Sequence, residues 1–166
     1  MLVNLGCGDR YVNGWVNVDH DGSPHRKDVS LDITKKLPWK SDEILHVFMG
    51  HVLEHLTQAQ SKSLLRRLRP LVQPIGQILI VGPDIEVATS MAEAGTLDVS
   101  LDSLRFGGRR WPGDDHKWEC TSARIVALLK DTGWRDIQDE GIDNVAAFWP
   151  VADRNPKWQF AITARS

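Results

Sequence analysis

The chain has 166 residues, of which 42% are apolar and 25% charged, with a formal net charge of −2. This balance predicts one globular domain over residues 1–166 and argues against the positive field of a typical nucleic-acid-binding protein. No apolar run approaches the ~20 residues of a membrane span. Two cysteines make no disulfide framework and no signal peptide precedes the first strand, so we expect a reduced, cytoplasmic protein.

Predicted strands and helices alternate along the chain. The predicted strands cover residues 2–5, 15–18, 29–31, 43–49, 77–81, 134–138 and 158–163. The first predicted helix begins near His51. The predicted helices cover residues 51–56, 58–68, 85–94 and 122–130. The stretch 95–119 is rich in glycine and is expected to be irregular.

This order predicts an α/β fold with a Rossmann-like, mostly parallel seven-stranded sheet and helices on both faces. The last two strands have no obvious helix between them, so we expect an antiparallel edge strand near the C-terminus. Only ten residues separate Gly8 from Asp19. Because a parallel crossover needs more chain than this, the first helix after strand one is predicted to be reduced or missing.

Residues that follow parallel strands meet at one edge of the sheet, where ligands bind in such folds. The residues in question are Gly6-Cys7-Gly8, Asp19-His20, Asp32-Ile33, Gly50-His51 and Pro83-Asp84. Glycines let a ligand approach the backbone. An acid after the second strand can accept both hydroxyls of a ribose, and an acid after the third can accept an amino group such as that of adenine. The spacing excludes the ordinary dinucleotide fingerprint, whose acid lies about 20 residues after the glycines.

The chain resembles the class I S-adenosylmethionine (SAM)-dependent methyltransferases, especially a small type-11-like subgroup. The resemblance spans nearly the whole chain through VNLGCG (3–8), GWVNVD (14–19), LPW (37–39), HVLEHL (51–56), LRPLVQPIGQILIVGPD (68–84), FGGRRWPGDDHKW (106–118) and ALLKDTGW (127–134). It implies SAM as the cofactor and O- or N-methylation of a small-molecule or sugar-type acceptor. Methylation of nucleic acid or protein, and a non-catalytic SAM- or nucleoside-binding protein, remain the alternatives.

The resemblance also implies a cofactor site. Its members are Leu5, Gly6, Cys7, Gly8, Arg10, Asp19, His20, Asp32, Ile33, Gly50 and His51. The glycine turn would pass under the methionine part of SAM, Asp19 would bind the ribose hydroxyls, and Asp32 and Ile33 would hold the adenine. Arg10 is either a partner of the SAM carboxylate or a solvated arginine. The family's upstream covering helix is not seen before strand one, so we expect an open site or one that a second subunit of a homo-oligomer covers.

The stretch 107–118 is predicted to fold back over this site and to supply the catalytic residues His116 and Asp115. If the acceptor is a hydroxyl or a protonated amine, a base must take its proton. Histidine titrates near neutrality, and the adjacent carboxylates of Asp114 and Asp115 could raise its basicity. The alternative is a loop histidine pinned by one of these carboxylates. Arg109 and Arg110 could bind an anionic acceptor.

A competing interpretation concerns His51 and His55. The sequence HVLEH fits the H-x-x-E-H pattern of inverted zinc peptidases, in which two histidines on one helix face bind the metal. We predict no metal, because that pattern needs a third ligand on a separate helical element and here it follows a buried strand. The basic residues Lys62, Arg66, Arg67 and Arg69 are expected to form a solvated helix face, so a nucleic-acid partner is not expected.

Overall fold

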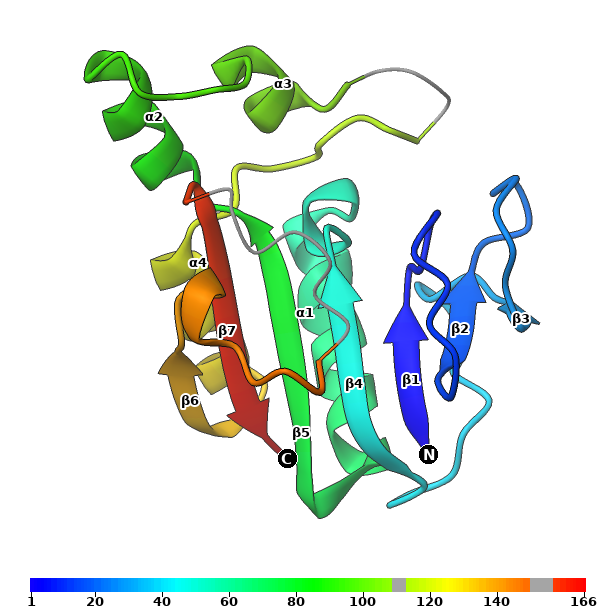
Figure 1. Cartoon of the computed structure of the whole chain (residues 1–166). Helices are drawn as coiled ribbons and strands as arrows, with labels where there is room; N and C mark the ends of the chain where they lie inside the picture. The colour runs from blue at the N-terminus through cyan, green and yellow to red at the C-terminus, as the bar shows by residue number, and fades with distance from the viewer. Residues whose placement is uncertain (109–112, 150–156) are drawn as a thin grey trace.

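The computed structural model describes residues 1–108, 113–149 and 157–166. Its centre is a seven-stranded sheet in the order β3-β2-β1-β4-β5-β7-β6 (Figure 1). The strands are β1 (Leu2–Leu5), β2 (Val16–Asp19), β3 (Val29–Ser30), β4 (Ile44–Gly50), β5 (Val72–Pro83), β6 (Arg135–Asp139) and β7 (Gln159–Arg165). β1 to β5 pair in parallel, whereas β7 runs antiparallel to both β5 and β6. The predicted fold class, with its antiparallel pairing near the C-terminus, is confirmed.

In the described part of the chain, four α-helices and three short 3₁₀ helices accompany the sheet. They are η1 (Leu53–His55), α1 (Gln58–Leu68), η2 (Arg69–Leu71), α2 (Ile85–Glu93), α3 (Leu101–Phe106), α4 (Ser122–Asp131) and η3 (Ile142–Asn144). The Asp84 carboxylate fixes the start of two helices, because it accepts from Glu86 N–H at the beginning of α2 and from Ser122 N–H at the beginning of α4. Among the described residues, no helix combines the length and apolar character that crossing a bilayer requires.

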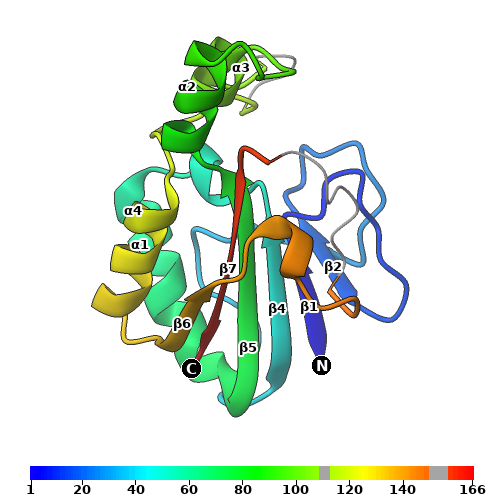
Figure 2. The same ribbon diagram turned by 60° about the vertical axis from the view of Figure 1, so that its left-hand side comes forward.

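The two faces of the sheet are covered differently (Figure 2). α1 and α4 pack on one face, where Leu64, Leu65 and Ile125 belong to the main buried core. The other face, for which we also expected helices, carries η3 and its flanking loops. There Trp15 and Trp149 lie with their ring centroids 5.9 Å apart, in a second buried cluster that includes strand residues of β4 and β5. Aromatic side chains thus cover the face from which the first helix is missing.

Side-chain hydrogen bonds replace that first helix between β1 and β2. Asn4 Nδ2 donates to Arg10 O (2.9 Å) and to Asn17 Oδ1 (3.0 Å). Asn17 Oδ1 also accepts from Val12 N–H, and its Nδ2 donates to Val12 O and to Asp28 Oδ2. Both asparagines are buried. They satisfy loop backbone groups that an α-helix would otherwise pair internally, so the short connection is an ordered element.

The predicted helix at 51–56 is wrong. Only Leu53–His55 forms a 3₁₀ turn, and α1 begins at Gln58 after the capping residue Thr57. His51 has φ +57°, which a right-handed helix cannot contain, and its N–H donates to Val81 O (2.8 Å). Two smaller differences are that α3 lies in the stretch expected to be irregular and that β5 begins at Val72 rather than at residue 77.

Candidate cofactor and acceptor site

The glycine turn after β1 lies directly against the acid that ends β2. Gly6 and Gly8 have φ +68° and +50°, in the left-handed region that glycine adopts without strain. Gly8 N–H donates to Asp19 Oδ2 (2.8 Å), and His20 N–H donates to Asp19 Oδ1 (2.7 Å). The structure therefore brings together the turn and the acid that the sequence singled out.

The Asp19 carboxylate is buried but keeps acceptor capacity. A carboxylate has about four lone-pair sites, and the two backbone N–H groups occupy two of them. The His20 ring is exposed, with Nε2 3.9 Å from Asp19 Oδ1. The fixed carboxylate thus has capacity for two further hydrogen bonds, the number that a pair of vicinal hydroxyls would donate.

The N–H groups of the glycine turn are already used within the protein. Gly6 N–H and Cys7 N–H both donate to Val18 O, at 2.8 and 3.0 Å, and Gly8 N–H is bonded to Asp19. No helix begins at this turn, so there is neither a row of free donors nor a helix dipole to hold a phosphate. The turn is suited to a ligand without a phosphate group.

Asp32 and Ile33 follow β3 beside this acid, because Leu31 N–H donates to Asp19 O (2.8 Å). Asp32 Oδ1 accepts from the Thr34 hydroxyl (2.6 Å) and the Thr34 N–H (2.9 Å). The hydroxyl hydrogen bond is the main reason that the pKa of Asp32 is lowered, so this exposed carboxyl is charged at neutral pH. Ile33 packs partly buried against the core. Their contact with adenine stays a prediction.

The remaining turn residues mainly support the loop. Leu5 is buried in the core. Cys7 is buried with its Sγ 3.7 Å from Arg26 O, and burial raises the pKa of its thiol to about 11. It is therefore a small protonated packing group. Arg10 N–H donates to Cys7 O (2.8 Å), and the predicted role of its side chain at the SAM carboxylate stays a prediction.

A second group of polar residues lies where β4 ends. Gly50 closes the strand, and His51 Nδ1 donates to Glu54 Oε1 (3.2 Å) from its left-handed conformation. Glu54 is 1% exposed. Its burial raises the pKa of the carboxyl, but the hydrogen bond from His51 and the interactions with His51 and His55 outweigh burial, so the pKa lies below its usual value. A buried carboxylate is thus held ionised among histidines.

The segment 113–119 docks on η1 and brings His116 to this carboxylate. Lys117 N–H donates to Glu54 O (2.7 Å), and Trp118 Nε1 donates to Leu53 O (2.8 Å). His116 Nδ1 donates to the backbone O of residue 104 (2.7 Å), and its ring centroid lies 4.9 Å from that of His55. The acid that acts electrostatically on His116 is Glu54, whose carboxylate raises the pKa of this histidine against the effect of burial.

The expectation that adjacent acids raise the basicity of His116 is wrong. Asp115 pairs with Lys117, and that hydrogen bond lowers the pKa of Asp115. Burial lowers the pKa of His116, and the nearby Glu54 carboxylate offsets only part of this effect. Whether His116 or Asp115 contacts an acceptor stays a prediction. Arg109 and Arg110, predicted to bind an anionic acceptor, lie outside the described residues.

The glycine turn with Asp19 and the polar residues that follow β4 come together at Gly6. A Cβ at this position would lie 2.5 Å from Cγ2 of Val52, so the glycine turn packs directly on the residue before η1. Sequence reasoning missed the part played by Glu54 and by the asparagines that hold the loop. The H-x-x-E-H pattern contains Glu54, but the pattern itself indicates His51 and His55 as a pair of metal ligands.

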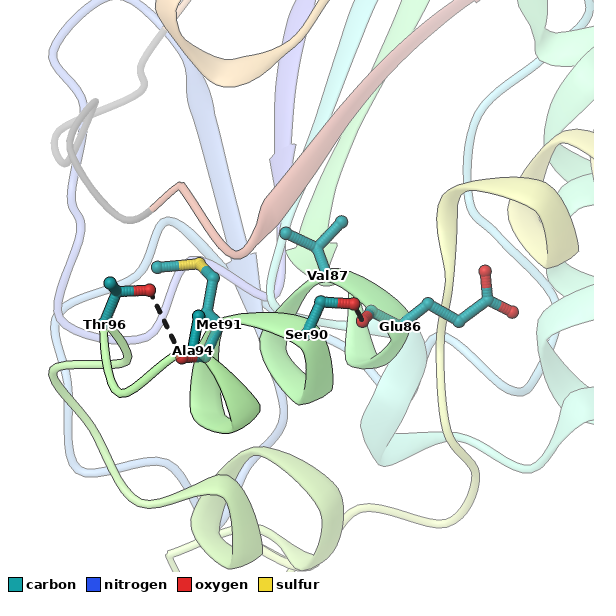
Figure 3. A pocket seen from close by; sticks show the side chains of 6 residues that line it. All are labelled: Glu86, Val87, Ser90, Met91, Ala94 and Thr96. Carbon is teal, nitrogen blue, oxygen red and sulfur yellow. Dashed lines mark hydrogen bonds between the residues drawn. The ribbon is translucent and has the colours of Figure 1, made fainter.

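A hollow of about 370 Å³ lies elsewhere, on the surface of α2 (Figure 3). Its lining residues are Glu86, Val87, Ser90, Met91, Ala94 and Thr96. None of them belongs to the predicted cofactor or catalytic set, and nothing in their chemistry indicates a ligand. The carboxyl ends of the parallel strands therefore stay the candidate site, as the sequence predicts.

The sheet order defines a Rossmann-like α/β protein, with the candidate polar site at the carboxyl ends of its parallel strands. No protein-family model matches the sequence, and a search of curated proteins found no match. Solved structures do match. Human N-acetylserotonin methyltransferase, in complex with SAM, covers 99% of this chain with a TM-score of 0.60 at 18% identity, and the chain spans 47% of its length.

Two further solved structures match this chain over nearly its whole length. A SAM-dependent methyltransferase from Archaeoglobus fulgidus has a TM-score of 0.64 at 16% identity over 99% of this chain and 85% of its own. The pyocyanin biosynthetic protein PhzM has a TM-score of 0.61 at 16% identity over 99% of this chain and 50% of its own. The chain thus spans about half the length of two of these three proteins. It has the fold of the SAM-dependent methyltransferases.

Proposed function

We propose that the protein is a SAM-dependent methyltransferase that acts on a small-molecule or sugar-type acceptor at oxygen or nitrogen. The observation that carries the proposal is the Asp19 carboxylate, which two backbone N–H groups hold beside the glycine turn of a methyltransferase fold. Its free acceptor sites suit the two ribose hydroxyls of SAM. The used N–H groups of the turn disfavour a phosphate-bearing dinucleotide and are compatible with SAM, which has no phosphate.

In this proposal the methionine part of SAM passes over Gly6–Gly8 and reaches His51, while the adenine lies near Asp32 and Ile33. Methyl transfer is an in-line displacement, so the protein mainly has to place the acceptor atom near the sulfonium carbon. The acceptor would enter from the side of the 113–119 segment, where His116 lies. The net charge of −2 favours a small acceptor over a nucleic acid.

Calorimetric titration with SAM and with its demethylated product, S-adenosylhomocysteine, tests the cofactor, with NAD as the phosphate-bearing control. We expect one saturable site for SAM and its product and none for NAD. Lack of binding by both adenosyl compounds would refute the proposal. Release of S-adenosylhomocysteine is then measured with sugars, amines, RNA and peptides as acceptors. Turnover only with RNA or peptides would contradict the assigned acceptor class, and binding without any turnover would indicate a non-catalytic protein.

A further inference from the structure

We propose that Glu54, His55 and His116 form a binding site for one divalent transition-metal ion, with Zn²⁺ as the probe. Each residue offers one ligand atom, and these atoms all lie within 4.8 Å of one another. Two imidazoles and one carboxylate are a ligand set that Zn²⁺ and related ions take in proteins. The site does not include Asp19, and it does not depend on the proposed activity.

The hydrogen bonds around Glu54 are those of an oriented ligand. The carboxylate is buried, and His51 Nδ1–H donates to its Oε1 at 3.2 Å. Ligating carboxylates are themselves hydrogen-bonded in metal sites, which fixes the direction of their lone pairs. In this assignment His51 orients the carboxylate and does not bind the ion, in contrast to the zinc-peptidase pattern.

The tautomer of His116 is also fixed from outside the cluster. Its Nδ1 lies 2.7 Å from the backbone oxygen of Leu104. A carbonyl oxygen only accepts, so Nδ1 carries the hydrogen and a neutral imidazole has its lone pair on Nε2. A ligating histidine almost always donates its other N–H to a carbonyl or carboxylate in this way.

His55 supplies the third observation. Its Nδ1 is buried and has no hydrogen-bond partner among the described residues. Buried polar atoms are nearly always paired, so an unpaired one needs an explanation. A bound cation beside this ring would give the cluster a partner that the protein alone does not provide.

Two hydrogen bonds to backbone oxygens of η1 keep the ligands of η1 and of the 113–119 segment together. These are Lys117 N–H to Glu54 O and Trp118 Nε1 to Leu53 O, at 2.7 and 2.8 Å. Tetrahedral Zn²⁺ with bonds of about 2.0–2.1 Å places its ligand atoms roughly 3.4 Å apart. The ligand atoms lie within 4.8 Å of one another, so side-chain rotations that bring them closer by at most roughly 1.4 Å close the site. Three protein ligands leave the fourth position open to a water or another oxygen donor.

Metal binding would change the predicted chemistry of His116. An Nε2 that binds the ion cannot also act as a general base. In a methyltransferase, the ion would instead lower the pKa of an acceptor hydroxyl bound at its open position. This last step rests on the proposed function, whereas the metal site itself does not.

The first experiment measures binding without SAM, so that its result is independent of the methyltransferase proposal. Protein treated with a chelator and then freed of it is titrated with Zn²⁺, and bound metal is counted by elemental mass spectrometry. We expect one ion per chain. His116→Asn keeps a side-chain donor for Leu104 O but removes Nε2, and it should weaken binding by more than ~100-fold. The exposed His25 is the control, and His25→Asn should bind like the parent protein.

A second measurement guards against variants that fail to fold. Co²⁺ is added to the parent, His55→Asn and His116→Asn proteins after circular dichroism has verified their fold. Visible d–d absorption of a low-symmetry site should appear in the parent only. The melting temperature of the parent should rise with Zn²⁺, since the ion binds the native state. Absence of a 1:1 site, or equal binding by His116→Asn and His25→Asn, would overturn the proposal.

Discussion

Replacing Asp19 with Ala tests the centre of the proposed cofactor site. The change removes two acceptors, one 2.8 Å from Gly8 N and one 2.7 Å from His20 N. It also removes the acceptors proposed for the ribose. Asp19→Asn is the more discriminating change, because an amide has one oxygen and can accept from only one of the two N–H groups in this geometry. Its NH₂ then faces the other donor.

The expected magnitudes follow from these contacts. A hydrogen bond to a charged group contributes about 1.5–3 kcal/mol, so losing both ribose contacts costs about 3 kcal/mol or more. This is roughly a 100-fold rise in Kd or more. The N–H left unpaired in Asp19→Asn costs about 1–3 kcal/mol of folding stability in addition. Both variants should therefore bind S-adenosylhomocysteine at least tenfold more weakly. Both should also melt at a lower temperature than the parent, because Asp19→Ala leaves both N–H groups without this acceptor and Asp19→Asn leaves one.

Calorimetric titration with S-adenosylhomocysteine is the assay, combined with thermal melting of the free protein. Asp131→Ala is the matched control for charge. It removes an acid at the end of α4, where the partner is Lys62 and the ion pair is exposed, so the affinity for the ligand should not change. If Asp19→Ala is folded and its Kd rises less than tenfold, the ribose role of Asp19 is refuted.

Two further predictions concern the glycine turn. Gly6→Ala should destabilise the protein by about 2–4 kcal/mol, because the residue has a left-handed φ and its new Cβ would clash with Val52. Gly14→Ala should cost only about 1–2 kcal/mol, because Gly14 also has a left-handed φ (+82°) but a Cβ there would meet open space. Equal urea midpoints would show that the Val52 contact is unimportant. The thiol of Cys7, whose pKa burial raises to about 11, should react slowly with a thiol reagent at pH 8 unless the chain is unfolded. Its contribution to stability should be complete below about pH 8.5 and fade as the pH rises toward 11; rapid reaction of the native protein would contradict this burial.

The sequence was sufficient for features that depend on local order. The glycine turn, Asp19 and the missing helix follow from strand periodicity and from the length of one loop, since ten residues cannot hold a parallel crossover. Helix α1 was predicted at its observed bounds because its stripe of leucines is a local signal.

Other features depend on contacts between distant residues, which a single sequence does not encode in a readable pattern. His51 takes a left-handed conformation because its N–H pairs with β5, and this ends the helical pattern of HVLEHL. His116 takes its hydrogen-bond partner from α3 and its acidic neighbour from η1, and neither choice follows from the adjacent Asp114 and Asp115. The pairing of Asn4 with Asn17 is likewise visible only after β1 and β2 align.

The short β1–β2 connection also affects how the chain folds. The entropy lost on closing a flexible loop grows with the logarithm of its length, so each halving saves about 0.6 kcal/mol. A parallel pair joined by a full crossover helix must close a longer segment before its ladder forms. Here Asn4 and Asn17 can meet across a short loop, and the β1–β2 pair with its asparagine contacts has a sequence separation closer to that of a hairpin. Losing a helix has given this sheet a low-contact-order parallel ladder, which lowers the entropic barrier to forming the edge that carries Asp19.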